Sequence, residues 1–384
     1  DGSLTLDLVD EGDTLTTLFR LSNQAAQTVI RSELSSSSTT IEVGSTTGIS
    51  VGDMLYVGSE AMEVTSITDG DTLTASRGSL GPGAAPDPPR GHALGTTFAT
   101  GFRVVLYDFA NWIDRGAEPA GCDPVLWQRL SWPGVQAMRD AGHDLVLIPV
   151  GATEQHGPHL PLGTDNAIAT ASCAYASART GVPMLPCMSY AVSIGHTAKW
   201  PGTVSMNHAT FIDSVHQVVS WLRPHGWSKV LLVNSHFGND AVLRVAVDRL
   251  RTDYLGELQV NAVNTFAVTP SVWSSFTADG EDIHANRAET DLMLYIDPDA
   301  VDREAMAHAD DQDRTAGAVF SYPVALTSTN GITGKPSDGN ADRGRELLIE
   351  IGEALAAKVE AGKTETPPLT LDMTLQVDKP ALAR

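Results

Sequence analysis

The sequence has few cysteines, few lysines and no long apolar run. Its 3 cysteines in 384 residues are too few for a disulfide framework in a chain of this length. None of them forms a CxxC pair, so we do not expect a thiolate zinc site. No apolar stretch reaches the length of about 18 residues that a transmembrane helix needs, so we expect no membrane span.

Positive charge is also scarce. The chain has 25 Lys and Arg against 47 Asp and Glu, which gives a formal net charge of −22. Nucleic-acid binding needs clustered basic side chains on the phosphates, so we expect no nucleic-acid partner. An acidic, lysine-poor composition favours an extracellular or particle-associated setting over a cytoplasmic one, although GC-rich coding would explain the same composition.

What the chain does have is enough apolar material for a sizeable core, 42% of its residues. Its length predicts two or three domains. Residues 1–80 have strand-like alternation separated by turn signals, and we interpret them as a small all-β module for attachment or assembly. One amphipathic helix is expected within residues 10–34. The predicted strands of this module are 39–43, 53–57, 60–67 and 72–76.

A Pro/Gly-rich linker and connecting segment is expected over 81–121. Residues 122–361 then alternate short apolar runs with helical patterns. This alternation predicts an α/β domain with a mostly parallel sheet and helices on both faces. The tail, 362–384, is expected to be extended. The predicted strands of the α/β domain are 145–150, 229–233 and 259–263, and its predicted helices are 166–179, 208–223, 239–252 and 341–360.

Polar side chains gather where these strands end, which is where open α/β sheets bind ligands. Each of them alone would more often be a helix cap or a hydrogen-bonded loop residue. Together they are typical of a divalent ion with mixed nitrogen and oxygen ligands. The residues are Glu154, His156, His159 and Asp165 after the first strand, His236 after the second, and His284 and Glu289 farther along.

Five motifs in this order resemble the creatininase (creatinine amidohydrolase) family over about residues 122–361. They are the stretch from LSWPGVQAM to GATEQHGPHLPLGTDNAIA, the segment IGHTAKWPGTVSM, the segment NSHFGN, the segment HANRAET and the loop GITGKPSDGNADRG. The resemblance implies a creatininase-like fold and a binuclear metal hydrolase that cleaves C–N bonds. The N-terminal module is only weakly similar to small β modules of phage and secreted proteins.

The resemblance also implies a ligand set. Glu154, Asp165 and His236 would hold one ion, and His156, Asp165 and Glu289 the second. In creatininase itself the last carboxylate lies two residues after the third-motif histidine, where this chain has Gly238. Glu289 of the HANRAET segment is the candidate replacement, as the resemblance to other members of the family implies. Two divalent ions are expected, with zinc fitting best and manganese or iron as alternatives.

Such a pair of ions lowers the pKa of a bridging water and polarises the substrate carbonyl. His284 is expected to protonate the leaving amine as general acid, with a hydrogen bond to a ligand carboxylate as the alternative. His159 is expected to brace its own loop. The residues expected to contact substrate are His196, Trp200, Ser235 and Phe237.

The departures from the family motifs argue against creatinine as the substrate. We expect a small amide, lactam, formamide or short peptide instead. The alternatives are a family-related metallopeptidase and a structural or assembly protein that uses this domain as a scaffold. The resemblance further implies a homo-oligomer, which the N-terminal module could assemble or attach.

Overall fold

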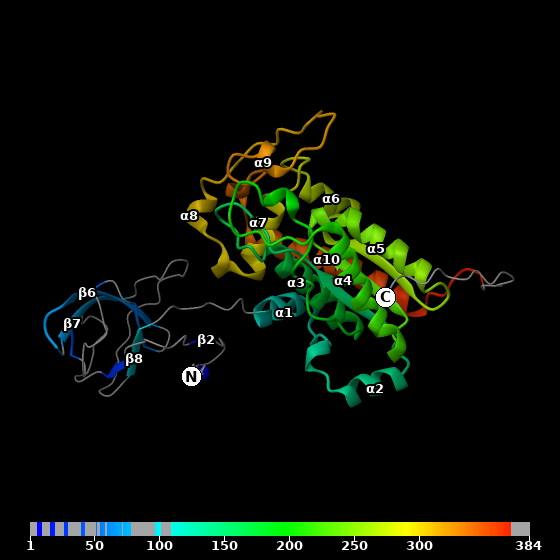
Figure 1. Cartoon of the computed structure of the whole chain (residues 1–384), viewed down its shortest axis with the longest axis horizontal. Helices are drawn as coiled ribbons and strands as arrows, with labels where there is room; N and C mark the ends of the chain where they lie inside the picture. The colour runs from blue at the N-terminus through cyan, green and yellow to red at the C-terminus, as the bar shows by residue number, and fades with distance from the viewer. Residues whose placement is uncertain are drawn as a thin grey trace. The chain divides into compact units, whose positions relative to one another are not determined.

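The computed structural model describes residues 6–9, 16–19, 27–29, 40–42, 51, 54–57, 60–70, 72–77, 97–100 and 109–369. The chain divides into two compact units, Asp1–Asp108 and Phe109–Arg384 (Figure 1). No helix in the described residues is long and apolar enough to cross a membrane.

The N-terminal unit holds an antiparallel six-stranded sheet in the order β3-β8-β5-β6-β7-β4 and a separate β1–β2 pair. All four strands expected over 39–76 are confirmed. The side chains of Leu73 and Ala75 are buried, and those of Thr74 and Ser76 between and after them are more exposed, as alternation predicts. The strands are β1 Leu6–Val9, β2 Thr16–Phe19, β3 Gln27–Val29, β4 Thr40–Glu42, β5 Met54–Val57, β6 Glu60–Ile67, β7 Thr72–Arg77 and β8 Thr97–Thr100.

Two expectations for the N-terminal part differ from the structure. The helix expected within 10–34 is wrong, because this segment contains β2, paired with β1, and β3, paired with β8. The β-branched Thr16, Thr17, Thr28 and Val29 favour strands over helix. The segment expected as a linker, 81–121, also contributes β8 to the sheet and a helix, α1 (Phe109–Ala117), to the second unit.

The second unit is built on a parallel three-stranded sheet in the order β11-β10-β9. The strands are β9 (Leu145–Val150), β10 (Lys229–Asn234) and β11 (Gln259–Asn264). All six residues of β9 are buried, as its continuous apolar run predicts. The pairing places Val150, Asn234 and Asn264 side by side at the carboxyl ends of the strands. The expected parallel sheet is confirmed.

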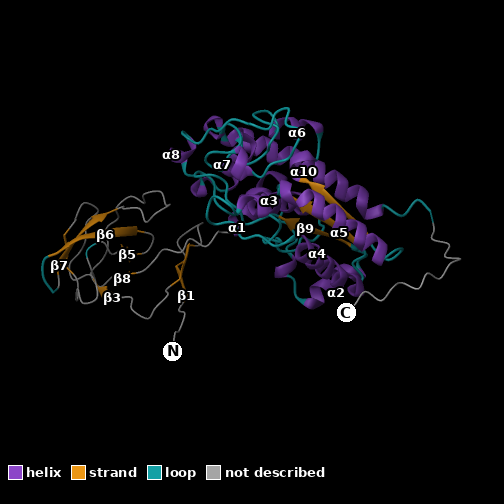
Figure 2. Cartoon of the chain, turned by 45° about the horizontal axis from the view of Figure 1, so that its top comes forward, coloured by secondary structure: helices purple, strands orange, loops and turns teal. Residues whose placement is uncertain are grey.

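Helices cover both faces of this sheet (Figure 2). Leu145 and Leu147 of β9 pack with α3, α7 and α10, whereas Val146 and Ile148 pack with α4 and α5. The helices are α2 Trp132–Asp140, α3 Thr164–Thr180, α4 His208–Leu222, α5 Asp240–Asp253, α6 Pro270–Phe276, α7 Arg287–Ile296, α8 Arg303–Met306, α9 Val324–Thr327 and α10 Ala341–Thr364. The expected tail thus begins at 365, three residues later than predicted, and residues 370–384 lie outside the described residues.

Close helix contacts hold α7 in place. A Cβ atom at Gly344 of α10 would overlap the carbonyl oxygen of Asp291 in α7, so the two helices touch through their backbones there. Arg343 adds a bidentate pair to the Asp291 carboxylate, with Nε to Oδ2 at 2.9 Å and Nη2 to Oδ1 at 2.9 Å. These contacts fix the helix whose first turn carries Glu289.

Candidate metal centre

Three segments bring the candidate ligands to the carboxyl end of the sheet. The loop after β9 carries Glu154 and His156 and leads into the first turn of α3, which carries Asp165. His236 follows β10 by two residues. Glu289 lies in the first turn of α7, which Asn286 caps by accepting a hydrogen bond from the Glu289 N–H at 3.2 Å. Candidate ligands from three separate segments of the chain therefore lie close together in space.

All five side chains expected as metal ligands come together. Glu154, Asp165 and His236 form one group, and His156, Asp165 and Glu289 form a second. Within each group the ligand atoms lie within 4.8 Å of one another, and Asp165 belongs to both. None of the five side chains is more than 5% exposed. These are the two ligand sets that the family resemblance implies.

The two carboxylates face the imidazoles at short range. His236 Nδ1 is 3.1 Å from Glu154 Oε1 and 3.2 Å from Asp165 Oδ2. His156 Nε2 is 3.3 Å from Asp165 Oδ1. One oxygen of Asp165 therefore faces each histidine, which is the arrangement a carboxylate shared by two ions requires.

Backbone carbonyls fix which nitrogen of each imidazole faces the centre. His236 donates from Nε2 to the Val192 carbonyl at 2.9 Å, and His156 donates from Nδ1 to the Glu154 carbonyl at 3.1 Å. Metal-binding histidines usually donate their second ring N–H in this way. The remaining nitrogen of each ring is left directed at the carboxylates.

Several buried atoms of the centre have no hydrogen-bond partner among the described residues. They are Glu154 Oε2, His156 Nε2, both carboxylate oxygens of Asp165, and Glu289 Oε2. Asp165 and His156 meet only through the ion pairs described above, and Glu289 Oε2 has neither kind of partner among the described residues. A buried polar atom without a partner costs about 1–3 kcal/mol. Divalent ions with oxygen and nitrogen ligands would satisfy these atoms together, so the residues fit a metal centre.

Without metal, protons have to balance the charge of the centre. Burial lowers the pKa of the His156 imidazole, but the Asp165 carboxylate outweighs burial and raises it to about 10. For His236, burial is likewise outweighed by Glu154 and Asp165, so its pKa lies well above the usual value. Burial raises the pKa of Glu289 to about 7, against the influence of His156. Metal binding must displace these protons.

Gly238 leaves no room for a carboxylate. A Cβ atom there would lie 2.5 Å from His236 Nε2 and 2.9 Å from the Val192 carbonyl oxygen. Any side chain at this position would push against the hydrogen bond that orients His236. Glu289, from α7, takes the third place of the second group instead.

His284 also lies at the centre. Its Nε2 is 2.8 Å from the Gln155 carbonyl oxygen, and its Nδ1 is 3.6 Å from Glu154 Oε1. Burial holds the pKa of His284 well below its usual value. The next residue, Ala285, has a φ of 49°, the positive-φ conformation that side chains other than glycine rarely adopt. Glu154, His156 and His284 form a third group that could hold an ion, so the geometry is compatible with a ligand role as well as with proton transfer.

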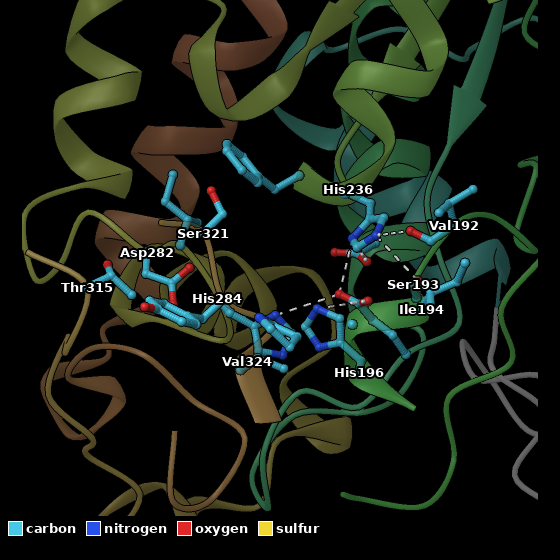
Figure 3. Close-up of a pocket in the computed structure, with 18 of the residues that line it drawn as sticks. Val192, Ser193, Ile194, His196, His236, Asp282, His284, Thr315, Ser321 and Val324 are labelled. Atoms are coloured by element: carbon cyan, nitrogen blue, oxygen red, sulfur yellow. Dashed lines mark hydrogen bonds and ion pairs between the residues drawn. The ribbon is translucent and has the colours of Figure 1, made fainter. Parts of the chain in front are cut away.

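A cavity of about 640 Å³ opens onto the centre (Figure 3). Of the residues expected to contact substrate, His196 and Phe237 line it. Ser235 and Trp200 are not among its lining residues: Ser235 is buried with its hydroxyl 2.9 Å from Thr265 Oγ1, and the ring of Trp200 lies against Lys199 Nζ. The structure therefore brings two of these four residues to the cavity.

His159 reaches beyond its own loop. Its Nε2 is 2.9 Å from the hydroxyl of Thr290 in α7, next to Glu289. Burial lowers its pKa to about 3, so the ring is neutral. His159 thus ties the loop after β9 to the helix that supplies Glu289.

Several residues of the site were not predicted from the sequence. Gln155 lies between two candidate ligands, and its amide Nε2 is 3.2 Å from His196 Nδ1 and 3.2 Å from the Gly331 carbonyl oxygen. Its place between Glu154 and His156 in the sequence could have predicted that Gln155 lies at the site. The cavity wall formed by 281–283 and 315–324 was also missed, because these segments have neither a motif nor a clear periodicity.

Comparison with known proteins identifies the family. The family described as "Creatininase: Creatinine amidohydrolase" matches residues 128–359, more than half of the chain. The chain belongs to the creatininase family. It is 28% identical over 262 residues to a creatinine amidohydrolase of Pseudomonas putida, covering 64% of this chain and 98% of that protein. It is 31% identical over 228 residues to a mycofactocin precursor peptide peptidase of Mycolicibacterium smegmatis, covering 56% of this chain and 84% of the peptidase.

Solved structures agree with this assignment. The crystal structure of a creatinine amidohydrolase superposes with a TM-score of 0.56 at 26% identity, covering 63% of this chain and 99% of that one. Related creatininase structures are described as a Zn-Zn type and a Mn form. The expected family and fold are thus confirmed, and the creatininase-family structures support a divalent metal.

Proposed function

We propose that this creatininase-family amidohydrolase uses two divalent ions to cleave a C–N bond of an amide, lactam, formamide or short peptide. The observation that carries the proposal is the pair of buried ligand groups that share Asp165. One group would hold the first ion through Glu154, Asp165 and His236, and the other would hold the second through His156, Asp165 and Glu289. Zinc fits this ligand set best, with manganese or iron as alternatives.

When bound, such ions supply Lewis acidity, which lowers the pKa of water and polarises a carbonyl. The protein's own residues orient the ligands and exclude water. Backbone carbonyls hold His156 and His236 in the orientation that metal ligands need. The near-complete burial of these groups keeps bulk water away and strengthens electrostatic interactions within the centre.

We propose that His284 transfers the proton to the leaving amine. Its Nδ1 faces Glu154, and the ring lies in the cavity wall beside His196, with ring centroids 4.2 Å apart. A neutral imidazole at this position can first accept a proton as water attacks and then donate it to the departing nitrogen. His196 and Phe237 line the cavity where substrate would enter.

The substrate is an amide or peptide other than creatinine. One relative is named for hydrolysis of creatinine and another for cleavage of a precursor peptide, so the fold accommodates both small and extended substrates. The absence of a carboxylate at Gly238, and the space too small for one, argue against carrying creatinine over to this chain. A family-related metallopeptidase is the variant of the proposal that the second relative favours.

The N-terminal sheet supports a further role in attachment or assembly. Every candidate metal group among the described residues lies in the second unit, so the described strands of the first unit contribute no candidate ligand. We propose that the chain forms a homo-oligomer in an extracellular or particle-associated setting. Light scattering on the full chain, compared with a chain starting at residue 109, tests whether residues before 109 contribute to assembly.

A hydrolysis screen tests the proposed activity. The protein is stripped with a chelator, reloaded with Zn²⁺ or Mn²⁺, and assayed on lactams, formamides and short peptides. We expect turnover of at least one class only after reloading. Asp165→Ala should abolish it, whereas Asp342→Ala, at an exposed position in the first turn of α10, should not. Metal-independent turnover, or none with metal on any class, would overturn the proposal.

A further inference from the structure

The cavity has a second wall that the metal chemistry does not use. It comes from the segments 281–283 and 315–324 and lies across from the side that carries His236 (Figure 3). Asp282, Thr315 and Ser321 gather on this side in the view. The aromatic side chains at the mouth are Phe237, Phe320 and Tyr322, which are 53%, 72% and 50% exposed.

The charge of this wall is negative. Apart from the side chains of the metal centre and its histidines, the charged lining residues are Glu281 and Asp282. His208 also lines the cavity. No Lys or Arg is among the described lining residues. A ligand that brings a carboxylate to this wall would find no cationic partner there.

The two carboxylates have no cation of the protein to neutralise them. Glu281 and Asp282 form no ion pair with any described residue; Asp282 instead accepts a hydrogen bond from the Thr327 hydroxyl at 3.3 Å. Nearby basic side chains are engaged elsewhere. Arg314 Nη2 pairs with Asp311 Oδ1 at 2.6 Å, and Lys199 Nζ donates to the Ser328 carbonyl at 2.8 Å. A cationic ligand can form a charge-assisted hydrogen bond with a carboxylate that has no ion-pair partner. Such a bond contributes more to binding when the carboxylate is partly buried at a cavity wall.

We propose that the substrate carries an ammonium or guanidinium group, joined to the scissile amide by an apolar spacer, and that Glu281 and Asp282 recognise this cation. This inference rests on the amidohydrolase function proposed above. The amide end meets the metal centre and the cationic end meets the opposite wall. The aromatic rings at the mouth cover the spacer, and the faces of Phe320 and Tyr322 also attract a cation.

A matched series of amides tests the proposal. The cationic members run from 3-aminopropanamide to 6-aminohexanamide. Each is compared with the neutral amide in which a methyl group replaces the ammonium, so that length and shape stay nearly constant. On zinc-loaded protein we expect one chain length at which the cationic amide has a kcat/KM about tenfold or more above that of its neutral partner. Equal values at every length, or a preference for the neutral amides, would overturn the proposal.

Charge-neutral variants identify the residues responsible. Asp282→Asn with Glu281→Gln should remove the preference for the cation, measured as the ratio of the kcat/KM of each cationic amide to that of its neutral partner. The control, Asp342→Asn with Glu346→Gln, removes the same two charges from exposed positions of α10 outside the cavity and should keep the preference. The single variant Glu281→Gln should lower the preference for the cationic amide, and because position 281 is exposed, it should not disturb folding. A preference that survives all cavity variants would overturn the assignment.

Binding separates this inference from the proposed function. If no amide of the series is hydrolysed, the result counts against the proposed amidohydrolase function. Calorimetric titration of the zinc-loaded protein with each pair of amides still measures whether the cationic member binds more tightly than its neutral partner. Tighter binding of the ammonium member, lost in the double variant, would support the cation site on its own. Equal or weaker binding of the ammonium member would overturn it.

Discussion

The two ends of the cavity differ in how tightly their residues are held. At the metal end the ligands are almost fully buried, each metal-facing imidazole is oriented by a backbone carbonyl, and Asp165 faces both histidines. At the mouth, Phe237, Phe320 and Tyr322 are half-exposed or more. A buried, fully oriented site tolerates few changes, whereas an exposed rim can change without disturbing the fold. We therefore expect the chemistry to depend on the buried ligands and the choice of substrate to depend on the exposed residues at the mouth.

The largest expected effect comes from removing a ligand at the buried end. His236→Ala deletes the ring that faces both Glu154 and Asp165 and should lower kcat/KM by about a thousandfold or more, because Lewis acidity is worth several kcal/mol. Steady-state kinetics and elemental analysis measure this loss. His225→Ala, at an exposed position after α4, is the control and should keep both metal and activity. Full activity in His236→Ala would contradict the ligand assignment.

Substitution of His284 separates proton transfer from metal binding. His284→Ala should lower kcat by about a hundredfold or more, the usual contribution of a general acid or base, while metal content stays at the wild-type value. Kinetics and elemental analysis on the same preparation check this. Loss of metal in the variant would instead make His284 a ligand, as the group it forms with Glu154 and His156 allows.

The pH dependence of metal binding follows from the protons held at the buried end. The pKa values of about 10 for His156 and about 7 for Glu289 are both raised, so at these two positions the metal-free folded state holds more protons than the unfolded chain. These two groups thus stabilise the metal-free protein at low pH, and that contribution is lost as pH rises through about 7 and then about 10.

Metal affinity should change in the opposite direction. It should rise by about tenfold per pH unit for each proton that the metal displaces. Calorimetry at pH 7 in buffers of different ionisation enthalpy should detect proton release. Affinity independent of pH between 6 and 9 would show that the centre holds no exchangeable protons.

The mouth should give the smallest effect. Phe320→Ala removes a ring that is 72% exposed and should raise KM only a few-fold with kcat unchanged, because rim contacts contribute little individually. Initial-rate kinetics on the best amide of the screen provide the test. A large fall in kcat would mean that the rim takes part in the reaction, and the contrast between the two ends would disappear.

The sequence predicted the metal end far better than the mouth. The apolar run 145–150 could only be a buried strand, and residues that follow such a strand must emerge at the edge of the sheet where His236 also lies. The rim segment 315–324 has no repeat, motif or periodicity, and only tertiary contacts bring it to the cavity. The prediction that Ser235 contacts substrate failed because its hydroxyl is buried 2.9 Å from Thr265 Oγ1, a tertiary contact that a sequence pattern does not reveal.

The N-terminal unit shows a similar limit. Leu15, Leu18 and Leu21 have helical spacing, yet the described residues 16–19 and 27–29 form strands. Their threonines and valine favour β structure, and pairing with β1 and β8 completes them. Its later strands were predictable, since their alternation is local.

Metal stoichiometry is the most direct test of the central claim. The protein is purified without chelator, reloaded with zinc, and analysed for metal per chain beside Asp165→Ala and the control Asp342→Ala. The shared carboxylate predicts about two ions per chain in the wild type and the control, and loss of both in Asp165→Ala. Fewer than about one ion per chain in the wild type, or wild-type metal content in Asp165→Ala, would contradict the account.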